Sequence, residues 1–136
     1  MSNVMRSEVS CKNEYWISKN RFYELKYFCR QWGEWHEKLK ELDGVVSVPT
    51  DISDNTEHGD YTADCAEMRE RYISNIELLK RVAVTTDPVL GVYILTGITR
   101  QWSYDIMRVR TNIPCGKNTY YHMYRRFMWL LSQRRY

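Results

Sequence analysis

The chain closes on TNIPCGKNTYYHMYRRFMWLLSQRRY, residues 111–136, and this stretch constrains the fold most. Pro114 disfavours helix at the residue before it, so we expect a terminal helix to begin near Gly116 and to run to about Gln133. Apolar and aromatic side chains recur in this stretch at intervals of three and four residues, which is the period of one helix face. The predicted buried face consists of Tyr120, Met123, Tyr124, Phe127, Leu130 and Leu131.

The remaining arc of the same helix is polar and cationic. The major groove of DNA admits one α-helix, so a helix with one apolar and one cationic face fits both a protein core and a duplex. Arg can bind guanine and Asn can bind adenine bidentately, and the free backbone N–H groups of the turn GKNT can hold a phosphate. The alternative is an amphipathic helix with a merely solvated basic face. The expected base or phosphate contacts are Lys117, Asn118, Thr119, Tyr121, His122, Arg125 and Arg126.

Two shorter helices are expected before the terminal one. Asp87 and Pro88 form a helix start, with Asp as the N-cap and Pro as the first helical residue. This helix should stop at Gly97, because glycine commonly ends helices, and a second helix should cover roughly residues 100–110. This order, closed by a tight turn and a long basic helix, is that of a helix-turn-helix. The expected contacts to the DNA backbone outside the last helix face are Arg108, Arg110, Arg134 and Arg135.

Charge is distributed unevenly along the chain. Residues 1–87 hold 12 Lys/Arg and 16 Asp/Glu, whereas residues 88–136 hold eight Lys/Arg and one acid, Asp105. A basic last third indicates a polyanionic partner. The alternative is a basic tail without a partner.

The first part of the chain predicts a helical hairpin. Residues 1–17 are mixed and polar, and we expect a flexible lead-in. A helix from Ser18 to about Asp43, kinked or divided at Gly33, and a second helix over about 62–84 would be joined by the loop 43–61 and would bury their apolar stripes together. The whole is therefore predicted to be all-α with five helices, arranged as a lead-in (1–17), an N-terminal helical hairpin (18–86) and a C-terminal helix-turn-helix (87–136).

Three segments resemble the RinA/ArpU-type transcription regulators of phages and prophages. They are RFYELKYFCRQWGEWHEKLKEL, TEHGDYTADCAEMRERYISNIELLKRV and ITRQWSYDIMRVRTNIPCGKNTYYHMYRRFMWLL, which together lie within residues 18–135. The last segment is similar to region 4 of sigma factors. The chain departs from the family pattern at Ile113, which is followed by Pro-Cys-Gly where the family has an Ile/Leu-Ser step. The resemblance implies a helix-turn-helix activator of late phage genes.

Other classes of protein find little support in the sequence. No apolar run reaches the length of a transmembrane helix, about 18 residues, and the N-terminus lacks the apolar core of a signal peptide. Cys11, Cys29, Cys65 and Cys115 are widely spaced, so we expect free thiols in the cytoplasm of a bacterial host cell. The acids of DISDNTEHGD are read as a solvated loop rather than a cation site, and no zinc spacing or nucleotide-binding motif is present. We therefore expect neither an enzyme nor a cofactor or metal.

The sequence predicts a DNA-binding transcription regulator of phage or prophage origin that reads the major groove with its last helix. Double-stranded DNA is the expected partner, and no membrane is expected. The hairpin would stabilise the DNA-binding region, form a homodimer or contact RNA polymerase. The alternative function is a non-enzymatic protein-interaction module, a phage inhibitor or adaptor, with a basic helical docking face.

Overall fold

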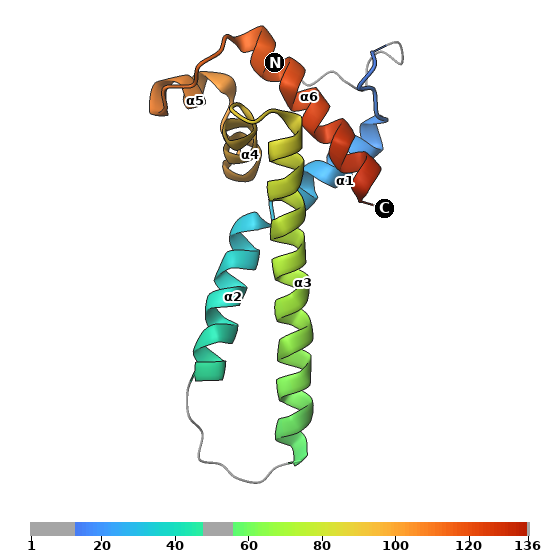
Figure 1. Cartoon of the computed structure of the whole chain (residues 1–136), viewed down its shortest axis with the longest axis vertical. Helices are drawn as coiled ribbons and strands as arrows, with labels where there is room; N and C mark the ends of the chain where they lie inside the picture. Colours follow the sequence, from blue (N-terminus) through green and yellow to red (C-terminus); the bar gives the residue numbers. More distant parts are fainter. Residues whose placement is uncertain (1–12, 48–55, 136) are drawn as a thin grey trace. The chain divides into compact units, whose positions relative to one another are not determined.

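A computed structural model of the chain describes residues 13–47 and 56–135, and these residues are helical with no strand among them. The all-α prediction is confirmed. Figure 1 shows the helices coloured from blue to red along the chain. In order they are α1 (Lys19–Cys29), α2 (Trp32–Ser47), α3 (Thr56–Thr86), α4 (Gly91–Arg100), α5 (Tyr104–Arg110) and α6 (Lys117–Arg134).

The chain divides into two compact units, and α3 contributes to both. One unit joins Met1–Gln31 to Leu79–Tyr136, and the other is Trp32–Leu78. The first unit holds 16 Lys/Arg and five Asp/Glu, a net charge of +11, whereas the second holds four and 12, a net charge of −8. The charge asymmetry of the sequence therefore follows the structural units, which differ from the predicted division at residue 86. We call them the basic unit and the acidic unit.

The acidic unit contains α2 and most of α3. Arg69 of α3 donates from Nε to Oδ1 of Asp43 on α2 at 3.0 Å, which ties the two helices together. Helix continues to Ser47 and resumes at Thr56, so the predicted loop 43–61 is too long at both ends. The centre of that loop, including Asp51 and Asp54, lies outside the described residues.

The predicted first helix is two helices in the structure. Ser18 caps α1 as expected, accepting from the backbone N–H of Arg21 at 3.2 Å. Helix α1 then ends at Cys29, and the break falls on Arg30 and Gln31 rather than on Gly33. Gly33 lies in the first turn of α2, and a Cβ there would meet no atom within 4 Å. The chain therefore has six helices in its described part, one more than predicted.

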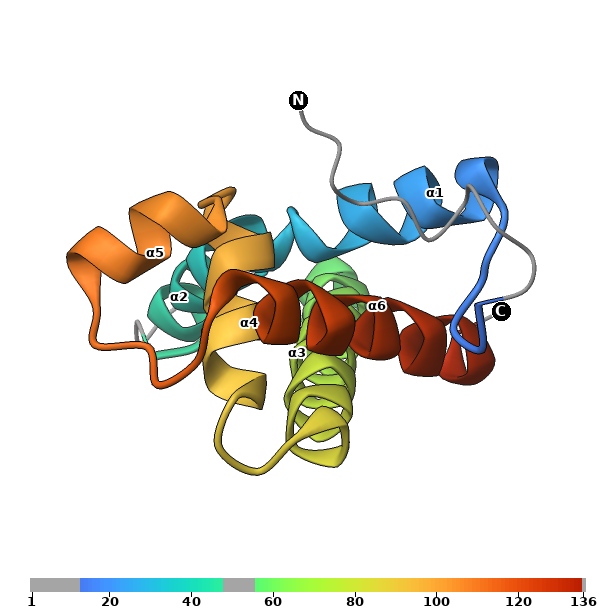
Figure 2. The same cartoon turned by 90° about the horizontal axis from the view of Figure 1, so that it is seen from above.

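Helix α6 is the centre of the basic unit. It runs alongside α1 and passes across α4, and it contacts both (Figure 2). Four residues of its predicted apolar face are buried, whereas Met123 and Leu130 are half-buried. Met128, which was not among the residues predicted to be buried, is fully buried, because α1 and α4 both contact α6 and together cover a wider face of it. The buried residues of α6 are Tyr120, Tyr124, Phe127, Met128 and Leu131.

The predicted helix end at Gly97 is wrong. Gly97 is buried inside α4, which continues to Arg100. The helix closes on Gln101, whose φ of 61° is left-handed, and the backbone N–H groups of Gln101 and Trp102 both donate to the carbonyl of Gly97. The bond from Trp102 is the 6→1 bond of a Schellman motif, and the bond from Gln101 is the 5→1 bond of the simpler left-handed cap. The left-handed position of such caps usually holds glycine, whereas here it holds Gln101.

Candidate nucleic-acid interface

Gly97 lets α4 and α6 approach closely. An added Cβ would lie under 3.0 Å from the hydroxyl of Tyr120 and 3.2 Å from Met107 Cε. Tyr120 is completely buried, and its hydroxyl has no hydrogen-bond partner among the described residues. Burial raises the pKa of this hydroxyl above its usual value, and the nearby Tyr121 and Cys115 raise the pKa further. Tyr120, the residue that directly follows the exposed first turn of α6 (Lys117–Thr119), is thus fixed against α4.

Two tyrosines hold α5 against the start of α6. The Tyr104 hydroxyl donates to the carbonyl of Cys115 at 2.6 Å, just before α6 begins. In return the backbone N–H of Tyr104, in the first turn of α5, donates to the Tyr121 hydroxyl at 3.2 Å. Lys117 and Asp105 form an exposed ion pair at 3.9 Å between the same two helix starts. These contacts fix where the first turn of α6 points relative to α5.

The first turn of α6 is the accessible part of the predicted reading face. Lys117, Asn118 and Thr119 are all exposed. Gly116 is the N-cap and supplies no side-chain hydrogen bond, so the first backbone N–H groups of the helix have no partner within it. On α5, Arg108 lies one turn after Asp105, on the face that meets Lys117. A helix start with free N–H groups and nearby cations suits an anion such as phosphate.

The face beyond the first turn is covered by the end of the predicted lead-in. Residues 13–17 are ordered in a turn, in which the backbone N–H of Tyr15 donates to Asn13 Oδ1 at 2.7 Å. The ring of Tyr15 lies 5.5 Å from that of His122 and 5.7 Å from that of Trp129. The start of the lead-in, residues 1–12, lies outside the described residues. His122 is therefore half-buried beside a neighbour and is not an open contact.

Arg126 serves the fold rather than an open surface, which corrects its placement on a free cationic face. Its Nε donates to the carbonyl of Thr86 at 3.1 Å and its Nη2 to that of Thr85 at 3.5 Å, the last carbonyls of α3. Its Nη1 also donates to the hydroxyl of Tyr15 at 3.2 Å. A guanidinium at a helix C-terminus satisfies orphan carbonyls and interacts favourably with the helix dipole. Arg126 is the C-terminal clamp of α3.

Arg125 and Tyr121 are also less available than predicted. Arg125 is half-buried, and its Nε is buried without a hydrogen-bond partner among the described residues. The ring of Tyr121 packs edge-on to that of Tyr120 at 5.0 Å, while its hydroxyl accepts from α5. Both side chains sit at the edge of the core, so neither is presented freely to solvent.

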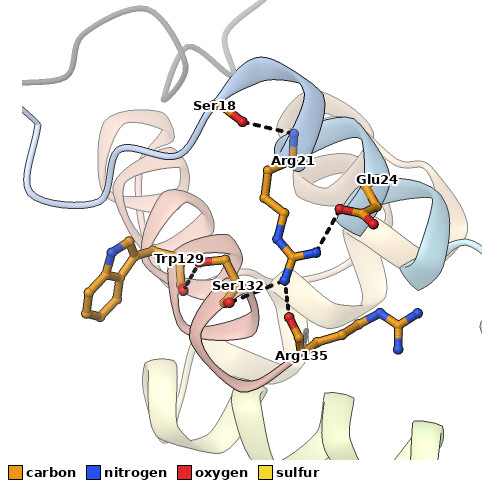
Figure 3. A network of polar contacts seen from close by, with 6 residues as sticks. All are labelled: Ser18, Arg21, Glu24, Trp129, Ser132 and Arg135. Carbon is orange, nitrogen blue, oxygen red and sulfur yellow. Dashed lines mark hydrogen bonds and ion pairs between the residues drawn. The ribbon is translucent and has the colours of Figure 1, made fainter.

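The last two predicted cations lie at the far end of α6. Seventeen residues separate Lys117 from Arg134, which is about 25 Å along a helix. The guanidinium carbon of Arg135 lies 3.7 Å from the centre of the Phe28 ring. The backbone carbonyls of Arg135 and Ser132 accept hydrogen bonds from the guanidinium of Arg21 (Figure 3). Arg21 also pairs with Glu24 at 2.7 Å. The structure therefore separates Arg134 and Arg135 from the first turn of α6, and Arg21 clamps the C-terminus of α6 as Arg126 clamps that of α3.

The sequence analysis missed Arg100 and Trp102 as site residues. The guanidinium carbons of Arg100 and Arg110 lie 5.4 and 5.1 Å from the centre of the Trp102 ring. Arg100 was assigned to the start of a helix and Trp102 to its interior, whereas the structure places Arg100 at the end of α4 and Trp102 in the turn before α5. The signal available in the sequence was Ser103, which caps α5 by accepting from Ile106 N–H at 3.3 Å.

The chain matches no family model, no curated protein and no solved structure. Within the described residues, no group of three or more His, Cys, Asp or Glu side chains is placed to hold a metal ion. None of the described helices has the length and apolar character needed to cross a membrane. Cys29, Cys65 and Cys115 are free thiols, and Cys11 lies outside the described residues.

Proposed function

We propose that the basic unit binds double-stranded DNA, with the first turn of α6 entering the major groove. The observation that carries the proposal is the exposed helix start Lys117–Thr119, which α4 and α5 hold in place within a unit of net charge +11. Three linked helices with a rigidly placed third helix are the arrangement that a helix-turn-helix uses. The finer proposal, a transcription regulator of phage or prophage origin, rests on the sequence resemblance.

The proposed contacts are fewer than the sequence predicted. Asn118 is the candidate for a base edge, with Thr119 beside it, and Lys117 is the candidate for a phosphate at the helix start, because all three residues occupy the exposed first turn. Arg108 and Arg110 are the candidates for phosphates, since both are exposed on α5. Arg126 and Arg135 are left out because they bind carbonyls or stack inside the unit.

The test is a titration of the full chain against a labelled mixed-sequence duplex across a salt series. Three neutralised phosphates give a slope of about −2.7 in log affinity against log salt, so affinity should fall roughly 40-fold between about 50 and 200 mM salt. Replacing Lys117 by Ala should reduce the magnitude of this slope by about 1. Lys38→Ala is the matched control, because Lys38 is an exposed lysine of the acidic unit.

Two results would contradict the proposal. One is the absence of binding at about 50 mM salt, where non-specific electrostatic attraction is strong. The other is an equal loss of affinity in the Lys117 and Lys38 variants.

The second candidate, a protein-interaction module, is favoured by the exposed apolar side chains of α5, Ile106 at 40% and Val109 at 81% exposure. Under that function, replacing Val109 by Ser would abolish association with a protein partner and leave DNA affinity unchanged.

A further inference from the structure

We infer that Arg100, Trp102 and Arg110 form a phosphate-binding element that takes a backbone phosphate of the bound duplex. This inference rests on the DNA-binding function proposed above and assigns a specific backbone contact to it. Arg100 ends α4, Trp102 lies in the turn between α4 and α5, and Arg110 ends α5, so all three lie outside the first turn of α6. Neither Arg100 nor Trp102 belongs to the reading face.

The two guanidiniums gather around one aromatic ring. Their carbons lie 5.4 and 5.1 Å from the ring centre, so they are no more than about 10.5 Å from each other. Both arginines are exposed, and among the described residues neither forms an ion pair. The acid nearest along the chain, Asp105, pairs instead with Lys117. Two exposed guanidiniums on one ring, without an acid partner among the described residues, both keep their N–H donors available to an anion.

The backbone of Trp102 is held in place by the end of α4. Trp102 donates its backbone N–H to Gly97 at 2.9 Å, and this requires the left-handed backbone of Gln101. Gln101 is the only residue other than glycine with a positive φ among the described residues. Gly97 in turn packs against Tyr120 of α6. The backbone that carries the ring is therefore positioned relative to the helix that would enter the groove, and pre-positioned groups bind with less loss of conformational freedom.

The chemistry of the element favours a phosphate. A guanidinium offers a planar fork of N–H donors that matches the oxygens of phosphate. A ring face attracts each cation and restricts where it can go, so the donors remain close together without an acid partner. A duplex backbone supplies one phosphate after another along its length, which lets the element bind while α6 occupies the groove.

The test compares DNA affinity and its salt dependence in variants of the full chain. The double variant Arg100→Gln/Arg110→Gln should reduce the magnitude of the salt slope by about 1, because the element takes one phosphate. The double variant Arg100→Lys/Arg110→Lys keeps the charge, so it should keep the slope but lose part of the affinity, because an ammonium lacks the planar fork. Arg71→Gln removes an exposed arginine from the acidic unit and should change neither quantity. Circular dichroism of each variant checks that the helices are intact.

The outcomes separate this inference from the proposed function. If the wild-type chain binds DNA with a steep salt dependence and the double glutamine variant binds identically, the element does not hold phosphate and the DNA-binding function stands. If the lysine and glutamine variants lose the same affinity and slope, the arginines act through the fold of the turn, which also overturns the inference. If the wild-type chain does not bind at about 50 mM salt, the DNA-binding function fails and the element loses its ligand.

Discussion

The contact between Gly97 and Tyr120 allows a test of how α4 positions α6. In Gly97→Ala the new Cβ would lie under 3.0 Å from a hydroxyl on a completely buried ring, so one helix must shift. Overpacking of this kind costs about 1–3 kcal/mol, whereas alanine in place of glycine inside a helix contributes about 1 kcal/mol of stability. We expect a net loss of up to about 2 kcal/mol in the free energy of unfolding.

Removing the hydroxyl should reverse the effect. Tyr120→Phe deletes a buried polar group without a partner among the described residues, so it should be neutral or stabilising by about 1 kcal/mol. In the double variant, the Cβ at position 97 next meets Met107 Cε at 3.2 Å, the end of a flexible side chain that can shift by the small distance needed, and a backbone oxygen at 3.4 Å, which is the edge of ordinary contact. The double variant should therefore recover the stability lost in Gly97→Ala, giving a favourable coupling energy of about 2 kcal/mol.

Urea denaturation followed by circular dichroism measures these free energies, provided that the slope with denaturant is unchanged between variants. Gly91→Ala is the matched control on the same helix. Its Cβ would clash with the backbone carbonyl of Ala83, so Tyr120→Phe cannot relieve it. Additive effects of the substitutions at 97 and 120, or equal rescue of Gly91→Ala, would refute the proposed contact.

Three further outcomes are expected. Arg126→Ala should lower the free energy of unfolding by about 2 kcal/mol, because two carbonyls of α3 lose a charged donor, and Arg126→Lys should restore less than half in thermal melts. Gln101→Gly should raise the free energy of unfolding by about 1 kcal/mol, because a left-handed backbone strains a residue that has a Cβ. An unchanged melting temperature would contradict this. Cys29 is completely buried and burial raises the pKa of its thiol, so it should remain unmodified by a thiol reagent at pH 8 in the folded chain and react only after unfolding.

The local features of the sequence predicted the helices well. The period of α6 and the helix starts at Ser18 and Gly116 depend on neighbouring residues, so sequence analysis identified them. Proline at 114 correctly placed the turn before α6. Glycine at 97 misled the prediction, because glycine serves either a helix end or a close helix contact, and only the packed structure distinguishes the two.

The surface of α6 could not be predicted in the same way. The hydrogen bonds that hold Arg126 come from residues 40 and 111 positions away, and a helical period carries no information about such partners. The same holds for Tyr15, which covers His122 from a segment that reads as a polar lead-in. Periodicity therefore identified the face that is buried by the helix itself, but it overstated the area left open.

The separation of charge between the two units has a practical consequence for handling the protein. A net charge of +3 and an isoelectric point near 8.7 suggest a mild cation that passes through an anion-exchange column at neutral pH. Adsorption to a resin depends on local surface charge, and the two units carry +11 and −8. The chain should thus be retained by both cation and anion exchangers at low ionic strength. Copies of the chain should also attract one another at low ionic strength, and added salt should weaken this attraction.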